Sequence, residues 1–327
     1  MKRLLLLLTF AATAGLHAQT NETVIDRSQQ PKPPAAPATA AGATFPGGDQ
    51  DAGTQRIAQP RGSLFKFIVS YDAQVYFTNN VFLTRADPVD AVIVADTFSA
   101  RAETPSWAVA GGLLTPSLGF TFQRYNHGLG TQDAARKSLD FDSYSLPLNL
   151  RFRFGENWEA NLGFTTSSIY RLNGPPDYHF IFRSYTPALS LSKAVSLGAH
   201  QILSLSAGTS YAFTKADTDS TPTISADRNN KYDGFASAGY YYFHDKWTVG
   251  PYASVIRSVY RHYEEFGPVS VNRRDTTCSL GASLSYAFNP HASARLFTSF
   301  DWRNSTSQIY TYDAANAGVG LTLSATF

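Results

Sequence analysis

The chain ends with the stretch NAGVGLTLSATF, residues 316–327, in which apolar side chains alternate with small or polar ones. Every odd-numbered position from Ala317 to Phe327 is apolar, and every even-numbered position carries Asn, Gly, Thr or Ser. Because successive side chains of a β-strand point to opposite faces, this period of two predicts a strand with one apolar face and one polar face.

The same alternation recurs along most of the chain upstream of this stretch. It is clear in FKFIVSYDAQV (residues 65–75), TCSLGASLSYAF (277–288) and SARLFTSFDW (293–302). We place strands near residues 63–78, 89–102, 107–125, 141–154, 157–170, 178–192, 200–213, 233–243, 246–262, 276–288, 292–303 and 316–327. The sequence therefore predicts about 12 strands; 10 or 14 are also compatible, because residues 79–110 are hard to assign.

The breaks between these strands differ in length. Short breaks fall near residues 154–156, 193–199, 244–246 and 289–291, and mostly longer, polar breaks fall near 126–140, 171–177, 214–232, 263–275 and 303–315. Short turns at one end and longer loops at the other are typical of outer-membrane barrels, whose short turns face the periplasm. This rhythm predicts an all-β fold, a closed antiparallel transmembrane β-barrel over residues 63–327.

A soluble β-sandwich would also alternate, but two features favour the membrane barrel. The predicted strands are often about 12 residues long, whereas strands of globular proteins average about 5–6 residues. Aromatic residues gather at the strand ends, as in the girdles of membrane barrels: Trp158, Tyr170, Trp247, Tyr260, Tyr286, Phe288 and Trp302. A helical membrane protein is excluded, because no unbroken run of about 18 apolar residues occurs.

The first 62 residues differ in composition from the rest. A basic start, an apolar core over residues 4–14 and a small-residue cleavage site at Leu16-His17-Ala18 predict a signal peptide over residues 1–18. Residues 19–62 are rich in Pro and Ala and have no apolar period, which predicts a periplasmic tail or linker. This tail could bind a periplasmic partner or be a solvated spacer. We expect it to bury no apolar surface, so its removal should leave folding intact.

The predicted mature chain is electrically balanced. Lys2 and Arg3 account for the whole formal net charge of +2, so no basic footprint for nucleic-acid binding remains. Cys278 is the single cysteine, which excludes an intrachain disulfide. No His/Cys cluster suggests zinc, and nothing in the sequence indicates a metal or a cofactor.

Two stretches resemble known outer-membrane proteins. The closing GVGLTLSATF, residues 318–327, resembles the C-terminal recognition strand of bacterial outer-membrane barrels, which ends in Phe after alternating apolar residues. This resemblance implies an outer-membrane location and recognition of Phe327 by the barrel-insertion machinery. The first hairpin, YFTNNVFLT at residues 76–84 followed by Pro88-Val89-Asp90, is similar to the opening of the type-2 β-barrel porins, in which Asp/Asn-Asn-Val recurs. This similarity implies a porin-like barrel and indicates no substrate.

Charged side chains in the strands should face the lumen, because a charge that faces lipid at mid-depth costs about 2–4 kcal/mol. The alternation predicts a set of pore-lining residues: Lys66, Asp72, Arg151, Arg153, Glu159, Arg295, Asp301 and Arg303. Several lie near the short turns and suggest a mildly basic constriction there. It would either favour anionic solutes or form an ion-pair network that plugs a narrow lumen. Arg183 and Arg257 break the alternation, which predicts a bulge or a shifted register at each.

Three classes of function fit this sequence. A porin-like channel for small solutes, anionic ones among them, fits the small side chains that the alternation places inside, such as Ser204, Ser206, Gly208, Ser283 and Gly320. Such a channel would lie in contact with outer-membrane lipid. A structural or export-associated outer-membrane scaffold is the alternative. An outer-membrane hydrolase would need rim residues such as His127, His262 with Glu264 and Glu265, or Asp217 with Asp219. None matches the His-x-Ser-Asn-Gly pattern of outer-membrane phospholipases, and Asp217-Thr218-Asp219 lacks the further oxygen ligands of a calcium loop, so we predict no enzyme.

Overall fold

The computed structural model describes residues 23–24, 65–127, 134–172, 178–217, 225–266 and 269–327. The predicted signal peptide (1–18), most of the predicted tail (19–62) and Asp219 lie outside the described residues. Side chains are not described for residues 263–271, which include Glu264 and Glu265.

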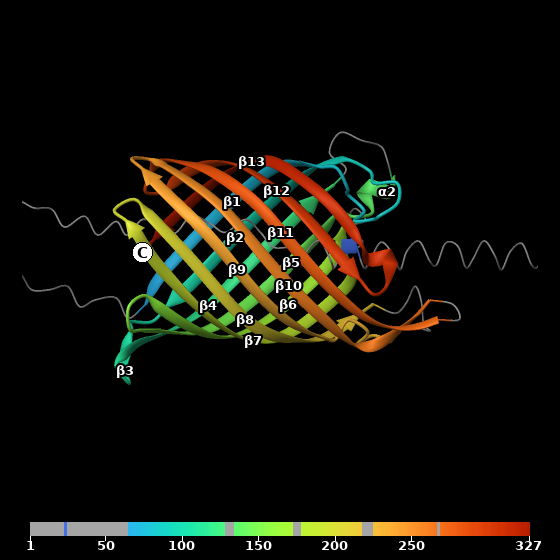
Figure 1. Cartoon of the computed structure of the whole chain (residues 1–327), viewed down its shortest axis with the longest axis horizontal. Helices are drawn as coiled ribbons and strands as arrows, with labels where there is room; N and C mark the ends of the chain where they lie inside the picture. Colours follow the sequence, from blue (N-terminus) through green and yellow to red (C-terminus); the bar gives the residue numbers. More distant parts are fainter. Residues whose placement is uncertain (1–22, 25–64, 128–133, 173–177, 218–224, 267–268) are drawn as a thin grey trace, which may run out of the picture.

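Twelve long antiparallel strands close into a barrel (Figure 1). They are β1 (Lys66–Thr78), β2 (Ala91–Glu103), β4 (Gly112–Asn126), β5 (Phe141–Phe154), β6 (Trp158–Leu172), β7 (Tyr178–Gly198), β8 (Gln201–Ala216), β9 (Lys231–His244), β10 (Trp247–Phe266), β11 (Val269–Asn289), β12 (Ala292–Ser305) and β13 (Tyr312–Thr326). Each pairs with its neighbours in the sequence, and β1 pairs with β13 to close the ring. The prediction of a closed antiparallel barrel of about 12 strands is confirmed.

Closure joins the two ends of the described barrel side by side. β1 and β13 pair from Ile68 opposite Thr326 to Thr78 opposite Asn316. Phe327 and Phe67 then exchange two backbone hydrogen bonds of 2.9 and 3.0 Å. A closed ladder satisfies the backbone N–H and C=O groups of every strand from within the sheet, which is what a lipid environment requires.

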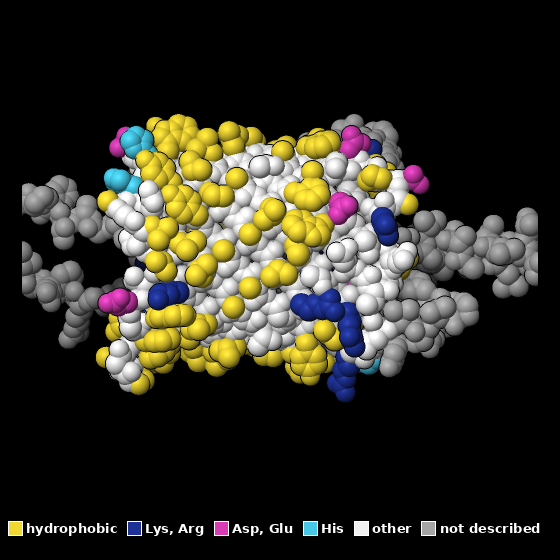
Figure 2. Space-filling view, viewed as in Figure 1, with side chains coloured by type: hydrophobic (Ala, Val, Ile, Leu, Met, Phe, Trp, Pro, Cys, Tyr) yellow, Lys and Arg dark blue, Asp and Glu magenta, His cyan; other side chains and the backbone are white. Residues whose placement is uncertain are grey.

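The alternation seen in the sequence separates an apolar outer wall from a polar inner wall. Odd-numbered residues of β1 and β13 face outward: Tyr71 is 42% exposed and Leu321 is 45% exposed. Their neighbours Asp72 and Thr322 contact each other on the inside. In Figure 2 hydrophobic side chains cover much of the outer wall between the two ends of the barrel. A barrel with its apolar side chains outside is arranged for a lipid surround.

Several predicted boundaries are wrong, and two stretches differ most. The strand expected over 107–125 is interrupted by a turn at Ala110 and Gly111, both with positive φ (47° and 76°). The resulting short strand β3 (Trp107–Val109) pairs only with β4 and lies outside the ring of twelve. The long break expected at 263–275 is instead an extension of β10 and β11, which pair up to Phe266 opposite Val269.

The Asn-Asn-Val stretch of the first loop has a structural role. The Asn80 side-chain amide donates to the carbonyl oxygens of Thr84 (2.6 Å) and Asp313 (2.8 Å). The Asn79 side-chain oxygen accepts from the backbone N–H of Ala315 at 2.7 Å. These bonds tie the loop between β1 and β2 to the start of β13, which explains the turn-forming asparagines without assigning them a ligand.

Helices are a minor part of the described structure. The four-residue α2 (Ala134–Lys137) precedes β5, and the single 3₁₀ turn η1 (Gln308–Tyr310) precedes β13. No helix among the described residues has the length and apolar character needed to cross a membrane.

The closed barrel predicts a simple biochemical behaviour. Because its strands are hydrogen-bonded all the way round, the detergent-solubilised protein should stay folded in SDS until it is boiled. The unboiled sample should migrate faster on a gel than the boiled one. A protein that is soluble without detergent and shows no such shift would contradict the membrane-barrel fold.

Candidate functional site: the barrel interior

At the end of the barrel that carries the short turns, five charged side chains form one network. Arg151 on β5 lies 3.3 Å from the Glu103 carboxylate on β2 and 3.9 Å from the Glu159 carboxylate on β6. Arg153 contacts Glu159 at 3.1 Å, and Arg101 contacts Glu103 at 3.2 Å. Three arginines thus face two glutamates, which leaves one positive charge in excess.

A second charged group lies halfway along the inner wall. Asp72 on β1 accepts hydrogen bonds from Arg295 on β12 (2.9 Å) and from the Thr322 hydroxyl on β13 (2.6 Å). Gly320 lies between these strands, and a Cβ atom at that position would lie 3.0 Å from the Arg295 Nε. The glycine therefore leaves the room that Arg295 needs to reach Asp72.

The loop end carries a third, more deeply buried charged group. Arg273 on β11 is fully buried and pairs with Asp275 at 2.7 Å. Its guanidinium carbon lies 4.2 Å from the Tyr260 ring centroid and 3.3 Å from that of Tyr310. Arg303 on β12 lies 3.8 Å from the same Asp275 carboxylate. Stacked and paired arginines of this kind hold β10, β11 and β12 together at this end.

Apolar side chains also gather inside the loop end, in a cluster that we call the loop-end cap. Its members are Val24, Val81, Ala91, Ile93, Ala95, Tyr125, Leu139, Phe141, Ile169, Ile181, Phe182 and Ala216. They come from β2, β4, β5, β6, β7 and β8, from the flanking loops and, in the case of Val24, from the predicted tail. Val24 is completely buried, and the Thr23 hydroxyl donates to the Phe82 carbonyl at 3.3 Å. The expectation that the tail buries no apolar surface is therefore wrong at Val24.

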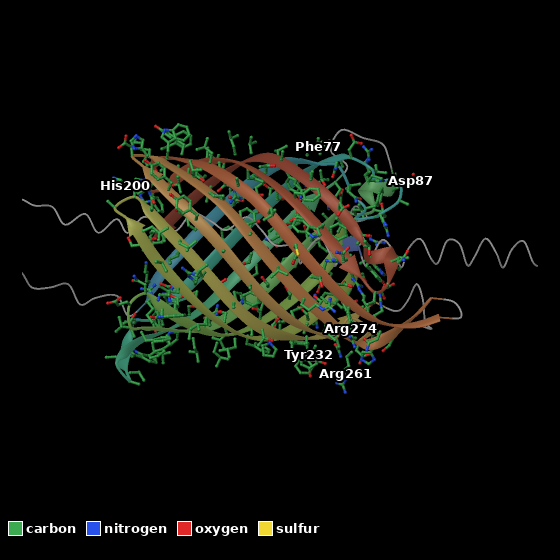
Figure 3. All side chains as sticks on the ribbon, viewed as in Figure 1. Phe77, Asp87, His200, Tyr232, Arg261 and Arg274 are labelled. Carbon is green, nitrogen blue, oxygen red and sulfur yellow. The ribbon has the colours of Figure 1, made fainter. Side chains whose placement is uncertain are left out.

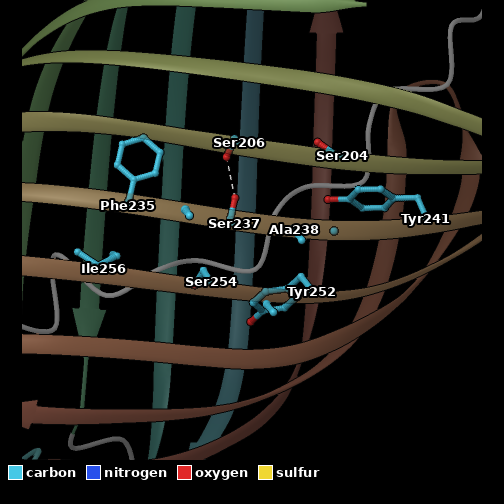
Figure 4. Close-up of a pocket in the computed structure, with 12 residues that line it drawn as sticks. Ser204, Ser206, Phe235, Ser237, Ala238, Tyr241, Tyr252, Ser254 and Ile256 are labelled. Carbon is cyan, nitrogen blue, oxygen red and sulfur yellow. Dashed lines mark hydrogen bonds between the residues drawn. The ribbon is translucent and has the colours of Figure 1, made fainter.

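Midway along β8, β9 and β10 the inner wall carries no charged side chain and several small ones. A recess of about 320 Å³ opens in the wall formed by β8, β9 and β10 (Figure 4). Its polar lining is hydroxyl groups, from Ser204, Ser206, Ser237, Ser254, Tyr241 and Tyr252, and Phe235 and Ile256 add apolar surface. The Ser206 and Ser237 hydroxyls lie 2.7 Å apart. Small hydroxyl side chains on three adjacent strands leave space inside the barrel that larger residues would fill.

The eight charged residues predicted from the sequence fall on inward-facing positions at three levels. Arg151, Arg153 and Glu159 belong to the turn-end network, and Lys66 pairs in register with Glu103 beside it. Asp72 and Arg295 form the middle pair. Asp301 and Arg303 lie at the loop end, where Asp301 accepts a hydrogen bond of 2.8 Å from Asn316. They do not form one ring, and their lining of a pore stays a prediction.

Sequence reasoning missed several charged residues of the described interior, among them Arg101, Glu103, Arg273 and Asp275. The first two lie at the end of β2, in the stretch that was hard to assign. The other two lie in residues 263–275, which were expected to be a loop. The alternation of Arg273 and Asp275 with the exposed Arg274 was a signal that could have placed them on a strand.

The histidines considered for catalysis each pair with a carboxylate. Buried His127 lies 3.5 Å from Asp140. His262 lies 3.0 Å from Asp227, whose carboxyl pKa is lowered first by a hydrogen bond from Ser225 and then by His262. Asp217 pairs with His179 at 2.8 Å, a partner that the sequence did not suggest. No hydroxyl of a described residue hydrogen-bonds to His179 or His262, and the described residues include no cluster of three metal-ligating side chains.

The terminal aromatic has the exposure expected of a recognition element. Phe327 is 75% exposed, and its backbone is already paired with Phe67. Its side chain therefore contributes little packing to the folded barrel, and its role as an insertion signal stays a prediction.

A substitution at Phe327 can therefore test the insertion of the barrel separately from its stability. Phe327→Ser should slow insertion and leave the protein in the periplasm, while the barrel that does form should keep its stability because little apolar area is lost. Phe288→Ser is the matched control: Phe288 is also exposed, at 49%, near the short turns. Normal surface assembly of Phe327→Ser, measured by protease accessibility and membrane fractionation, would show that the terminal aromatic is incidental.

No protein-family model matches the sequence, and no curated protein matches it. Solved structures do match the chain. The chain is similar to the COG4313 outer membrane channel from Pseudomonas putida F1, with a TM-score of 0.52 and 12% identity over 81% of this chain and 96% of that chain. It is also similar to the translocator domain of the autotransporter NalP from Neisseria meningitidis, with a TM-score of 0.41 and 14% identity over 81% of this chain and 90% of that chain.

The likeness to these proteins is one of fold. Identities of 12% and 14% carry no information about substrates, and of these two neighbours only the channel has a TM-score above 0.5. Together with the ring of twelve paired strands and its apolar outer wall, the likeness leads to one conclusion. The chain has the fold of the bacterial outer-membrane β-barrels.

Proposed function

We propose that this protein is an outer-membrane channel for small solutes. The observation that carries the proposal is the recess of about 320 Å³ midway along β8, β9 and β10. Its lining carries no charged side chain, and its serines leave space that larger residues would fill. The Pseudomonas putida neighbour is an outer membrane channel, which supports the same function.

The proposed location is the outer membrane, reached through cleavage of the signal peptide over residues 1–18. Exposed apolar side chains on the outer wall and charged side chains on the inner wall support it. In this orientation the short turns face the periplasm and the loops face the exterior.

A weak preference for anions is part of the proposal. The turn-end network has one positive charge in excess, and Lys66 lies beside it. The Asp72–Arg295 pair is neutral. An excess of one or two charges in a narrow, low-dielectric passage raises the local concentration of counter-ions without binding them tightly.

A scaffold is the second candidate, and the loop-end cap is the observation that favours it. Six of the twelve barrel strands contribute buried apolar side chains to the cap, and Val24 fills a place among them. A barrel that stays closed at this end would anchor its loops or its N-terminal tail for a partner and would pass no solute.

Conductance of the refolded protein in a planar bilayer tests the proposal. A channel should give discrete current steps that depend on the protein and are absent from the boiled sample. If neither the wild type nor a variant with a disrupted cap conducts, the channel proposal is wrong and the scaffold remains.

A further inference from the structure

Three arginines lie on the outer wall of the barrel near its loop end. Arg257 and Arg261 are on β10, where they alternate with the buried Ser258 and Tyr260, and Arg274 is on the neighbouring β11. All three are exposed. Arg257 is paired with Thr276 and Val259 with Arg274, which places Arg274 beside both β10 arginines. Figure 3 shows Arg261 and Arg274 on the outside of the barrel, with Tyr232 nearby.

In the described part of the barrel, this cluster keeps its positive charge. Among the described residues, none of the three arginines forms an ion pair. The nearest strand carboxylates point inward, because Asp233 accepts from Ser258 and Asp275 pairs with Arg273. The outward positions beside the arginines carry no carboxylate: Tyr232, Gly234, Thr276 and Asn304. At Gly234, opposite Arg257, nothing lies within 4 Å of where a Cβ would be, so the surface beside that guanidinium is open.

The cluster lies at the border of the apolar belt. Toward the middle of the wall the outward positions of the same strands are Val255 and Leu280, which are 39% and 52% exposed. Figure 2 shows Lys and Arg side chains on the loop-end part of this face, beside the hydrophobic surface. Tyr211 and Tyr232, with ring centroids 4.3 Å apart, lie next to Arg261, as aromatic residues do at the level of lipid headgroups. An outward-facing arginine costs little at this level and much more at mid-membrane.

Another arginine of the outer wall, Arg124, differs from this cluster because it is paired with a carboxylate. Arg124 on β4 makes two hydrogen bonds of 2.8 Å to Asp142, and Tyr178 donates a third to the same carboxylate at 2.8 Å. This guanidinium is satisfied within the protein. Arg257 donates one hydrogen bond to the Thr276 hydroxyl, and Arg261 lies beside the Tyr211 hydroxyl. Among the described residues, no carboxylate accepts from Arg257, Arg261 or Arg274, so their remaining donors can bind an anion from outside.

We propose that Arg257, Arg261 and Arg274 bind phosphate groups of a lipid headgroup in the leaflet on the loop side of the membrane. The planar guanidinium fork matches phosphate oxygens in pairs of hydrogen bonds, and three such groups on two adjacent strands suit a headgroup with more than one phosphate. The proposal rests on the membrane location given under the proposed function. It also explains why Arg257 breaks the alternation: its register is regular, and the shift in β10 comes later, between Val259 and Tyr263.

Native mass spectrometry of the detergent-solubilised, heat-modifiable protein tests this site with diphosphoryl lipid A as the probe. Arg257→Gln with Arg274→Gln should weaken lipid binding by about 10- to 30-fold, since each cation near a charged lipid surface contributes about a five-fold factor in affinity. Lys193→Gln with Lys246→Gln removes the same charge at the turn end, where Lys193 lies over the Trp158 ring, and should leave binding unchanged.

Three results would overturn the proposal. Equal affinity of the arginine double variant and the wild type would place the lipid elsewhere. Equal binding of fully dephosphorylated lipid A would remove phosphate from the recognition. Saturation of the site by inorganic pyrophosphate at the same concentration as the lipid would identify a free anion site. A protein that shows no heat shift and does not enter lipid vesicles would instead refute the membrane location, and the proposed channel with it.

Discussion

Replacing Arg151 and Arg153 together with glutamate should turn a weak chloride preference into a clear potassium preference. In the wild type, Arg101, Arg151 and Arg153 face Glu103 and Glu159, which gives a net charge of +1 at this level. The double substitution leaves Arg101 against four carboxylates, a net charge of −3. Such a reversal in a passage with low-dielectric walls changes which ion is concentrated there.

Reversal potentials under a KCl gradient measure this change. The difference should shrink at high salt, where the screening length falls to about 3 Å at 1 M. Arg257→Glu with Arg274→Glu is the matched control, because it makes the same charge change on the outer wall and should leave selectivity unaltered. An open pore whose selectivity ignores the Arg151 and Arg153 substitutions would place the turn-end network outside the conducting path.

The inward and outward faces of the barrel could be predicted because the alternation of apolar and polar residues is visible within each strand. Arg295 and Asp301 alternate with Leu296 and Phe300, so the apolar neighbours alone assign the charged residues to the inside. The turns could be located for the same reason, since the alternation stops at breaks such as Asn289-Pro290-His291. These properties are local and need no knowledge of which strand is next to which.

The pairing of charges could not be predicted, because it depends on closure and tilt. Arg151 contacts Glu103, 48 residues away, across the intervening β4, where Thr115 and Ser117 are small. The sequence analysis placed Glu159 beside these arginines but missed Glu103, and so suggested a more basic constriction than the network has. Arg273 and Asp275 were missed for another reason: they alternate with Asn272 and Arg274, so both faces of this part of β11 are polar and the sequence resembles a loop.

Arg183 and Arg257, which break the alternation, show where charged strand residues need not face inward. Arg183 follows a bulge in β7, where the pairing with β6 shifts between Ile169 and Tyr170, so the predicted irregularity lies next to it. At Arg257 the register is regular, and the prediction of a local shift is wrong. Alternation of apolar and polar residues is a consequence of lipid contact, and it no longer applies at the height of the headgroups.

Val24→Asp should raise the single-channel conductance several-fold, because it puts a carboxylate into the loop-end cap. Val24 is completely buried among Val81, Leu139, Phe141 and Ile181. Valine needs no hydrogen-bonding partner in this cluster. An ionised carboxylate buried among apolar side chains without a partner costs several kcal/mol or more. The residue should therefore leave the cap, and the side chains around it lose the surface against which they pack.

The barrel itself should be unaffected by this change, because Val24 belongs to no strand of the ring. The heat shift of Val24→Asp should equal that of the wild type, and Val24→Ile, which keeps the cap apolar, should conduct like the wild type. Removal of residues 19–62 should match Val24→Asp in conductance and should still fold, in accord with a tail that is not needed for strand pairing. If both variants conduct no better than the wild type, the cap does not limit the current, and the narrowest point must lie at the turn-end network. If removal of the tail instead abolishes the heat shift, Val24 and its neighbours are part of the folding core, and the division of the chain at residue 62 is wrong.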